Sequence, residues 1–175
     1  MAETCRVLIV ARTKMHGNRV CVGALSDEGE NLRLLNAKCG YDASSFEVGE
    51  LWDISFERCQ IRPPHIEDVA VTTKARIALE PEASKFILAR IDPWRGSIAT
   101  LFDSMIQFTG TGSGYISERG GLPSTATGFW LPDSSLRRED VSRGQLYGPK
   151  SDYRHLKYVG FQEPVQEIPK GQLVR

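Results

Sequence analysis

Apolar and polar residues alternate along several stretches of the first 80 residues, and this alternation predicts β-strands. In the segment ELWDISFERC, Trp52, Ile54 and Phe56 fall on one face, opposite Asp53 and Ser55. Turn residues separate four further strand-like runs, and His16-Gly17-Asn18 is the expected hairpin connection between the first two of them. These runs are CRVLIVART, RVCVGALS, LRLLN and VAVTTKARIAL. Five short strands joined by turns are typical of a small closed or nearly closed β-barrel.

The period of the apolar positions changes in the middle of the chain. In RGSIATLFDSMIQF the spacing i, i+3, i+4, i+7, i+8 predicts an amphipathic helix. In EPEASKFILARI a shorter helix is predicted, with Pro81 in its first turn. Because the residue before a proline disfavours helical backbone, the Asp92-Pro93 junction is expected to separate the two helices.

The last third returns to short strand-like segments, and it contains an echo of the first half. The strand candidates are GYIS, TGFWLP, QLYG and HLKYVGFQ. In FEVGELWDI and EIPKGQLVR the patterns match, with Gly49 aligned on Gly171 and Leu51 on Leu173. A turn leading into a strand is common, but its recurrence in each β-rich half indicates two related barrels.

The glycine-rich stretch SGYISERGGLPSTATGFW carries more aromatic surface than a solvated linker needs. Together with the preceding GTGSG, it could present backbone N–H groups to a phosphate. It lacks the signatures of a P-loop, a dinucleotide-binding turn and a nucleophile elbow. The favoured interpretation is a loop that leads into a second barrel, with Phe129 and Trp130 beginning a packed strand.

Composition and charge indicate a globular protein rather than a disordered or membrane-spanning one. Hydrophobic residues make up 41% of the 175 residues and charged residues 25%. No apolar run approaches the roughly 18 residues of a membrane helix, and no secretion signal is recognisable, so a cytoplasmic location is expected. The 22 acidic and 22 basic residues cancel, which argues against a histone-like DNA binder. Residues 5–24, however, hold four basic residues and no acidic one, which could form a local basic face.

Cysteine and histidine spacing favours neither a metal site nor a cofactor. The cysteines, at positions 5, 21, 39 and 59, form no C-x-x-C pair and are expected to be reduced thiols in or near strands. His65, Glu67 and Asp68 could form a metal or acid–base site, but a turn leading into a strand is favoured there. With no convincing catalytic motif in the chain, the protein is expected not to be an enzyme and to need no cofactor.

Aromatic and basic residues interleave in the final third, as they do where single-stranded nucleic acid is bound. Bases stack on aromatic rings for roughly 1–3 kcal/mol each while cations follow the phosphate backbone. Most of the rings, including Phe129, Trp130 and Phe161, could equally fill barrel interiors. The candidate binding residues of this part are Tyr115, Arg119, Arg137, Arg138, Tyr153, Arg154, Lys157 and Tyr158, with Arg143 a further basic residue among them.

Several of these segments, in this order, resemble the dual OB-containing domain family, DuOB. They are NRVCVGALSDEGENLRLLN, FEVGELWDISF, PPHIED, LFDSMIQFTGTGSGYISERGGLPSTATGFW and YRHLKYVGFQ. The resemblance implies a mainly β protein with a helical insert and two OB-like β-barrels in tandem. It places the first barrel at residues 1–79, a helical connector at 80–109 and the second barrel at 110–175. Since the family pattern runs beyond the position of Arg175, the second barrel is expected to be incomplete at the C-terminus.

The resemblance also implies a function, a nucleic-acid-binding or sensing module associated with bacterial conflict and defence. OB-folds bind ligands on the face of strands 2 and 3 and on the flanking loops. In the first barrel this rule adds Arg12, Lys14, Arg19 and Arg33 to the candidate nucleic-acid-binding residues. Single-stranded nucleic acid is the favoured partner. The alternative is a protein–protein interaction adaptor that binds another protein of the same system, which the neutral net charge favours.

Overall fold

The computed structural model describes residues 2–36, 41–42, 44–60, 63, 65–142 and 144–175. Its backbone contacts divide the chain into two units, Met1–Asp92 and Pro93–Arg175. The division falls at the Asp92-Pro93 junction, inside the stretch 80–109 that was expected to act as a connector. The structure is mainly β, and it contains a single short α-helix among the described residues.

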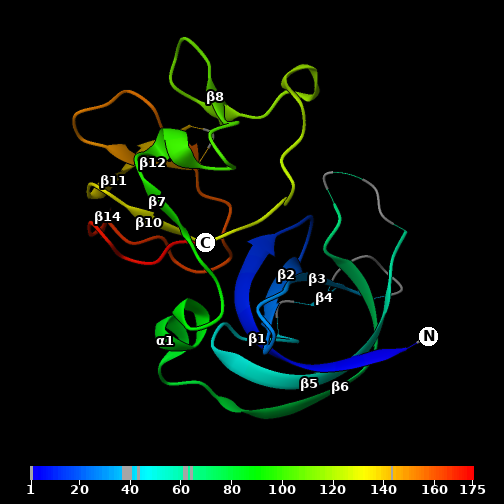
Figure 1. Cartoon of the computed structure of the whole chain (residues 1–175). Helices are drawn as coiled ribbons and strands as arrows, with labels where there is room; N and C mark the ends of the chain where they lie inside the picture. The colour runs from blue at the N-terminus through cyan, green and yellow to red at the C-terminus, as the bar shows by residue number, and fades with distance from the viewer. Residues whose placement is uncertain (1, 37–40, 43, 61–62, 64, 143) are drawn as a thin grey trace. The chain divides into compact units, whose positions relative to one another are not determined.

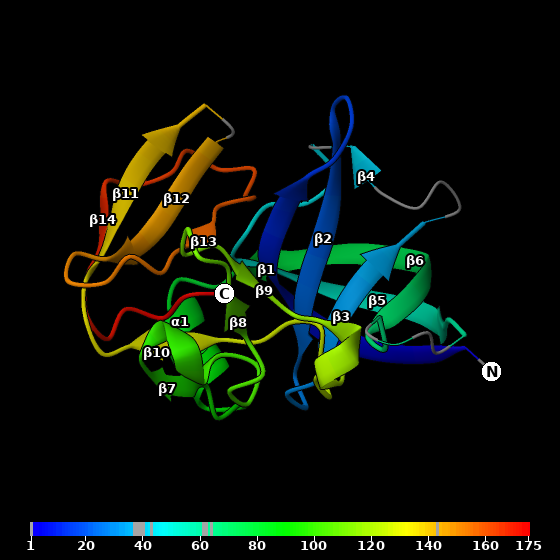
Figure 2. The ribbon, with the colours of Figure 1, turned by 90° about the horizontal axis from the view of Figure 1, so that it is seen from above.

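Five strands of the first unit hydrogen-bond into a closed ring, in the order β1-β5-β6-β3-β2 and back to β1 (Figures 1 and 2). All pairings are antiparallel except that of β3 with β6. This confirms the five strands and the small barrel that the alternation predicts. The strands are β1 (Glu3–Lys14), β2 (Arg19–Ser26), β3 (Asn31–Leu35), β5 (Glu50–Arg58) and β6 (Asp68–Leu79).

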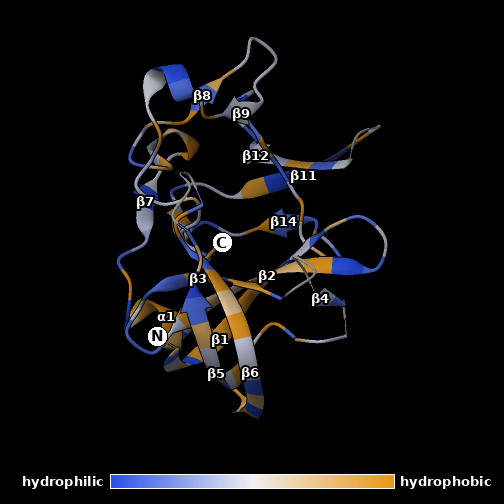
Figure 3. Cartoon of the chain, turned by 90° about the vertical axis from the view of Figure 1, so that its right-hand side faces the viewer, coloured by the Kyte–Doolittle hydropathy of each residue, from blue (hydrophilic) through white to orange (hydrophobic). Residues whose placement is uncertain are grey.

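The barrel closes around the alternating apolar residues of these strands. Val22 pairs with Leu34 and Ala24 with Leu32 across β2 and β3, and all four side chains are buried. Directly opposed residues of paired strands point to the same face, so the register brings the apolar rows together. Figure 3 shows the resulting concentration of hydrophobic residues along β2. Burying this row is the main driving force for closing the ring.

The ring is irregular in two respects. The parallel pairing of β3 with β6 spans only three residue pairs, Arg33–Asp68 to Leu35–Ala70. The register of β5 with β6 shifts twice, and such bulges bend and twist a strand strongly enough to close a small barrel. A short additional strand, β4 (Tyr41–Asp42), pairs with the N-terminal end of β2. The hairpin between β1 and β2 turns at Gly17, as expected.

Of the two predicted helices, only the first is present. Helix α1 (Ala83–Leu88) lies in the predicted segment and begins two residues after Pro81. The helix predicted over residues 95–108 is wrong. That segment forms one 3-10 turn (Ile98–Thr100), and Phe102, Asp103 and Ser104 have φ values of 53°, 56° and 65°. Three consecutive left-handed residues cannot continue a right-handed helix.

The turns of this segment bury its regularly spaced apolar residues as well as a helix would. Ile98, Leu101 and Ile106 are buried in one core with Trp130. The indole N–H of Trp94 donates a hydrogen bond of 3.1 Å to Oδ1 of Asp103, which holds the left-handed turn. The periodicity therefore correctly predicted which residues are buried, although it predicted the wrong backbone conformation.

The strands of the second unit form several small sheets. One sheet has the order β13-β12-β11-β14, and two pairs are β10 with β7 and β8 with β9. The core of the second unit contains Trp130, Leu136 and Tyr147. Phe129 and Trp130 are buried at the start of β10, as predicted. The strands are β7 (Trp94–Gly96), β8 (Gln107–Phe108), β9 (Gly114–Tyr115), β10 (Trp130–Pro132), β11 (Leu136–Val141), β12 (Gly144–Pro149), β13 (Leu156–Lys157) and β14 (Glu167–Ile168).

The echo between the two halves of the sequence is also an echo in structure. Gly49 and Gly171 both adopt a positive φ, 93° and 72°. Their N–H groups donate to strand carbonyls, that of Ile9 at 2.9 Å and that of Pro132 at 2.8 Å. In each case the residue after the glycine bonds to the carbonyl three residues earlier, at 3.2 and 3.1 Å. The two units thus repeat one local turn at matched sequence positions.

Three cysteines are free thiols, and all three lie in or directly after a strand, as expected. Burial, with added repulsion from Asp27 and Glu30, raises the pKa of Cys5 to about 11. Since the thiolate is the reactive form, we expect the Cys5 thiol to react slowly near neutral pH. Cys39 lies outside the described residues.

The carboxylate of Glu50 predicts an acid-sensitive contribution to stability. Burial alone would raise its pKa, but hydrogen bonds from the Glu47 N–H (2.9 Å), the Trp52 indole (3.0 Å) and Arg76 (2.5 Å) lower the pKa below its ordinary value of 4.5. A depressed carboxyl pKa stabilises the fold above the unfolded-state pKa and loses this effect as the pH falls through the folded value. Urea unfolding of wild type and Glu50→Gln should therefore differ clearly at pH 7 and converge well below pH 4.5.

Candidate nucleic-acid interface

The predicted cations of the first unit do not form one basic patch. Arg12 pairs with Val22 and Lys14 with Val20 across the β1–β2 hairpin, so these two cations share the face of two buried valines. Arg19 is next to Val20 in β2 and therefore lies on the opposite face. Lys14 is exposed and Arg19 is half-buried.

Arg12 and Arg33 are committed to ion pairs inside the first unit. Arg12 is only 7% exposed, and it donates to the carbonyl of Phe46 at 2.9 Å and to the carboxylate of Glu47 at 2.7 Å. Arg33 makes two parallel hydrogen bonds of 2.5 Å to Asp68, and these bonds raise the pKa of the guanidinium. The Arg33–Asp68 ion pair links β3 to β6, the two strands whose parallel pairing closes the barrel. Both guanidinium groups thus hold the fold together and are already matched by carboxylates.

The segment around His65 has the same structural role. Asp68 is the partner of Arg33, and the carbonyl of Glu67 accepts a 2.7 Å hydrogen bond from the Arg33 N–H. In the part of the chain that the structure describes, no group of three metal-ligating side chains is present. The segment leads into β6, which begins at Asp68, and a turn leading into a strand is the arrangement that the sequence favours here.

Apart from Arg154, which is described below, the predicted cations of the second unit fall into two groups. Arg137 lies 3.5 Å from Glu167, and Arg138 donates to the Pro164 carbonyl at 2.7 Å and to Asp140 at 3.1 Å. The other group consists of Arg119 and Lys157, whose side chains are exposed. Arg143 lies outside the described residues.

The tyrosines also differ in position. Tyr153 is 66% exposed and Tyr115 is 45% exposed, so both rings are open to a ligand. Tyr158 is half-buried, packs edge-on against Tyr147 at 6.0 Å and donates a hydrogen bond to the Gln162 carbonyl at 3.0 Å. Burial raises the pKa of Tyr158. The predicted exposed ring of Tyr158 is therefore mostly a core contact.

The glycine-rich loop lies directly against the segment 153–155. Oγ of Ser113 and Nε2 of His155 are 3.0 Å apart, and Gly114 N–H donates to the His155 carbonyl at 3.1 Å. The His155 N–H donates in turn to the Gly112 carbonyl at 2.9 Å. This small parallel bridge fixes two loops that are 42 residues apart in sequence.

We call the result the glycine-loop surface, formed by Phe108, Ser113, Tyr153, Arg154 and His155. The guanidinium of Arg154 lies 5.4 Å from the centre of the Phe108 ring, within cation–π range. It is also hydrogen-bonded to Asp152 at 2.6 Å, which raises the pKa of Arg154. Tyr115 follows this loop directly on β9. The interleaved aromatic and basic residues of the sequence indicated Tyr153 and Arg154 but not Phe108 and His155. The signals for these two were their positions beside GTGSG and inside YRH.

Substituting Gly112 should separate these two loops. A Cβ on Gly112 would lie 2.1 Å from the Tyr153 carbonyl oxygen, and the glycine has a φ of 91°. Gly112→Ala is expected to lower the free energy of unfolding by about 1–3 kcal/mol, as over-packed sites do. Gly110→Ala is the matched control, because nothing lies within 4 Å of its Cβ position. Equal stability of the two variants in urea unfolding would show that the loops are not in contact.

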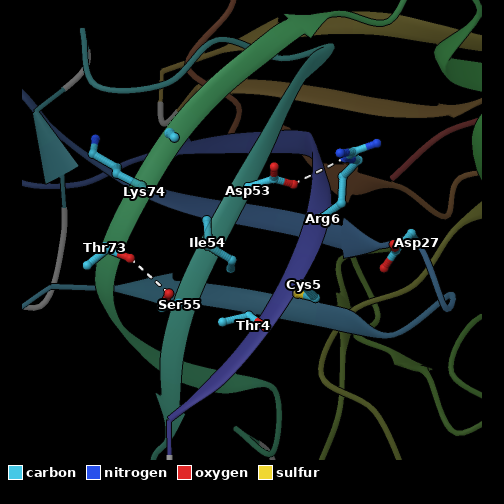
Figure 4. Close-up of a pocket in the computed structure, with 10 residues that line it drawn as sticks. Thr4, Cys5, Arg6, Asp27, Asp53, Ile54, Ser55, Thr73 and Lys74 are labelled. Carbon is cyan, nitrogen blue, oxygen red and sulfur yellow. Dashed lines mark hydrogen bonds and ion pairs between the residues drawn. The ribbon is translucent and has the colours of Figure 1, made fainter.

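A concave feature lies over β1, β5 and β6 of the first barrel (Figure 4). This groove has a volume of about 610 Å³ and is lined mainly by polar side chains. Across its floor, Arg6 pairs with Asp53 at 3.1 Å, and the Thr73 hydroxyl donates to Oγ of Ser55 at 2.9 Å. The alternation in β5 predicts a polar face on this strand, but the groove itself is evident only in the structure.

The closed five-stranded ring with one parallel pairing defines a protein built on the OB type of β-barrel. The family model for the dual OB-containing domain matches residues 5–166, and the chain belongs to this family. Searches of curated proteins and of solved structures found no match. Among the described residues, no helix has the length and apolar character needed to cross a membrane.

Proposed function

We propose that this chain is a non-catalytic module that binds or senses single-stranded nucleic acid. The observation that carries the proposal is the glycine-loop surface, where an exposed tyrosine stands next to an arginine that lies within cation–π range of a phenylalanine. Aromatic rings beside cations are the combination that holds single strands without reading their sequence. Membership of an OB-containing family supports a binding role, since OB barrels are widely used for oligonucleotides.

In the proposed mechanism, bases stack on Tyr153 and Tyr115 while cations contact the phosphates. Arg119 and Lys157 are two exposed cations of this unit that can do so. Unpaired bases are required, because a duplex hides the faces that stack. Since several other arginines are already paired with carboxylates, the phosphate contribution is modest and base stacking supplies much of the affinity.

The proposal also covers the biological role of the chain and the cellular compartment in which it acts. A role in bacterial conflict or defence, in the cytoplasm, fits a small module that recognises nucleic acid by chemistry common to all sequences. The free thiols of Cys5, Cys21 and Cys59 suit a reducing compartment.

Replacing the most exposed ring tests the stacking role. Tyr153→Ala should weaken binding of a labelled single-stranded oligonucleotide by roughly fivefold to a hundredfold, the equivalent of about 1–3 kcal/mol for one stacked base. Fluorescence anisotropy measures the affinity. Tyr153→Phe keeps the ring and should bind like wild type. If Tyr153→Ala also binds like wild type, base stacking at this surface is refuted.

A protein-interaction adaptor is the second candidate, and the groove of Figure 4 favours it. Its Arg6–Asp53 pair and its row of hydroxyls offer both charges and hydrogen-bonding groups to a polypeptide. Arg6 and Asp53 are each about half exposed, so a partner can reach them. A protein partner whose binding is lost in Asp53→Ala, in a chain that binds no oligonucleotide, would establish the adaptor instead.

A further inference from the structure

Three aromatic rings surround the ammonium group of Lys74 in the first unit. The Nζ atom lies 4.1 Å from the ring centre of Phe46, 5.1 Å from that of Tyr41 and 5.2 Å from that of Trp52. All three distances are within the range in which the negative face of a ring attracts a cation. The rings come from β4, from the segment before β5 and from β5 itself. We call this arrangement the aromatic cage.

The rings are oriented as walls, not as a stacking platform. Tyr41 and Phe46 meet at 89° and Phe46 and Trp52 at 62°, with centroid distances of 4.9 Å in both cases. A nucleobase needs a ring parallel to its own plane, and walls at steep angles offer little such area. A rounded cation can contact several walls at once. The geometry therefore favours a compact cation over a base.

Glu50 fixes one wall of the cage and adds negative potential. Its carboxylate accepts the indole N–H of Trp52 at 3.0 Å, which sets the direction of that ring. The carboxylate also pairs with Arg76 at 2.5 Å on its other oxygen. Because Glu50 is buried and held by several donors, the wall is preorganised before any ligand arrives.

Lys74 is a poorly matched occupant of the cage. Its ammonium group has one long hydrogen bond of 3.4 Å, to the carbonyl of Ser45, and no carboxylate of a described residue lies within ion-pair distance. An ammonium carries three N–H donors, so part of its hydration is lost without replacement. In agreement, burial lowers the pKa of Lys74, with a smaller opposing effect from Glu50. Lys74 is an exposed residue as a whole, so its side chain has room to leave the cage.

We propose that the aromatic cage is a binding site for a quaternary ammonium group, and that Lys74 occupies it when no ligand is bound. A quaternary ammonium has no N–H donors to leave unsatisfied, and it keeps the positive charge that the rings attract. It therefore competes effectively with the primary ammonium of Lys74. Trimethyl-lysine in a peptide and choline-type small molecules share this chemistry. The site is in the first unit and is independent of the nucleic-acid interface proposed for the second.

Lys74→Ala, which empties the cage, provides the test. Isothermal titration with choline and with a trimethyl-lysine peptide should show binding, about tenfold or more tighter than to the uncharged isostere 3,3-dimethyl-1-butanol. Wild type should bind more weakly than Lys74→Ala, since its own lysine competes. Preference for the peptide over choline would identify a protein partner, and the reverse a small molecule.

Further variants separate a cage from a nonspecific apolar site. In the Lys74→Ala background, Trp52→Leu should abolish binding and Trp52→Phe should retain most of it. No binding of either quaternary ligand to folded Lys74→Ala, or equal binding of the uncharged isostere, overturns the proposal. If Lys74→Ala does not fold, NMR of wild type decides. Tetramethylammonium should then return the ring-shifted Lys74 methylene signals to ordinary positions, and signals that stay in place overturn the proposal.

Discussion

Phe46→Ala should lower the free energy of unfolding by about 3–5 kcal/mol, the usual loss when a buried phenylalanine is truncated. The side chain is 1% exposed and lies between the rings of Tyr41 and Trp52, at 4.9 Å from each. Removing it leaves a cavity between two rigid walls, which cannot collapse without moving β4 or β5. Urea unfolding followed by tryptophan fluorescence measures the loss.

Two controls show what the loss at Phe46 means. Phe46→Leu fills most of the space and should cost clearly less than the alanine variant. Phe86→Ala removes the same side chain from the half-buried face of α1 and should cost less as well. A loss below about 1 kcal/mol for Phe46→Ala would contradict its place in the core, since such a loss is close to the roughly 0.5 kcal/mol that substitutions at surface positions cause.

Trp130→Ala should have an effect of similar size in the second unit, about 3–5 kcal/mol. The side chain is 3% exposed and packs with Ile98, Leu101 and Leu136. Its indole N–H also donates to the Gly96 carbonyl at 3.0 Å, which links β10 to its parallel partner β7. The substitution therefore opens a cavity and removes one of the two hydrogen bonds that the Gly96 carbonyl accepts, the other coming from the Asp133 N–H at 3.1 Å.

Trp130→Phe distinguishes these two effects. It keeps an aromatic ring in the core but loses the hydrogen bond to Gly96, so the expected loss is about 1–3 kcal/mol. Urea unfolding of the two variants gives both values. If the alanine and phenylalanine variants unfold at the same urea concentration, the core around Trp130 is not packed as described.

The strands of the first unit could be predicted because alternating apolar and polar residues fit only one backbone conformation, an extended strand. Val20, Val22 and Ala24 can all be buried only if the backbone is extended, and polar neighbours then face outward. Residues 95–108 were ambiguous in a way that the strands were not. Their apolar spacing fits a helix, but the left-handed backbone at Phe102, Asp103 and Ser104 bends the chain into turns that bury the same residues. Periodicity identifies buried positions more reliably than it identifies backbone conformation.

The candidate site was predictable only in part, because charge pairing over long sequence distances leaves no local signal. Arg12 meets Glu47 and Arg33 meets Asp68 across 35 residues each, so both cations looked available in the sequence. Tyr153 and Arg154 were found because aromatic and basic residues alternate there. The aromatic cage was missed, since its rings come from separate segments that only the barrel brings together.

The central claim is that this dual OB-containing chain binds single-stranded nucleic acid. Titrating the wild-type chain into fluorescent single- and double-stranded oligonucleotides at low and at high salt tests it most directly. We expect binding at low salt, a preference for the single strand, and weaker binding at high salt as phosphate contacts are screened. No binding of either oligonucleotide at low salt, where phosphate contacts are strongest, would contradict it.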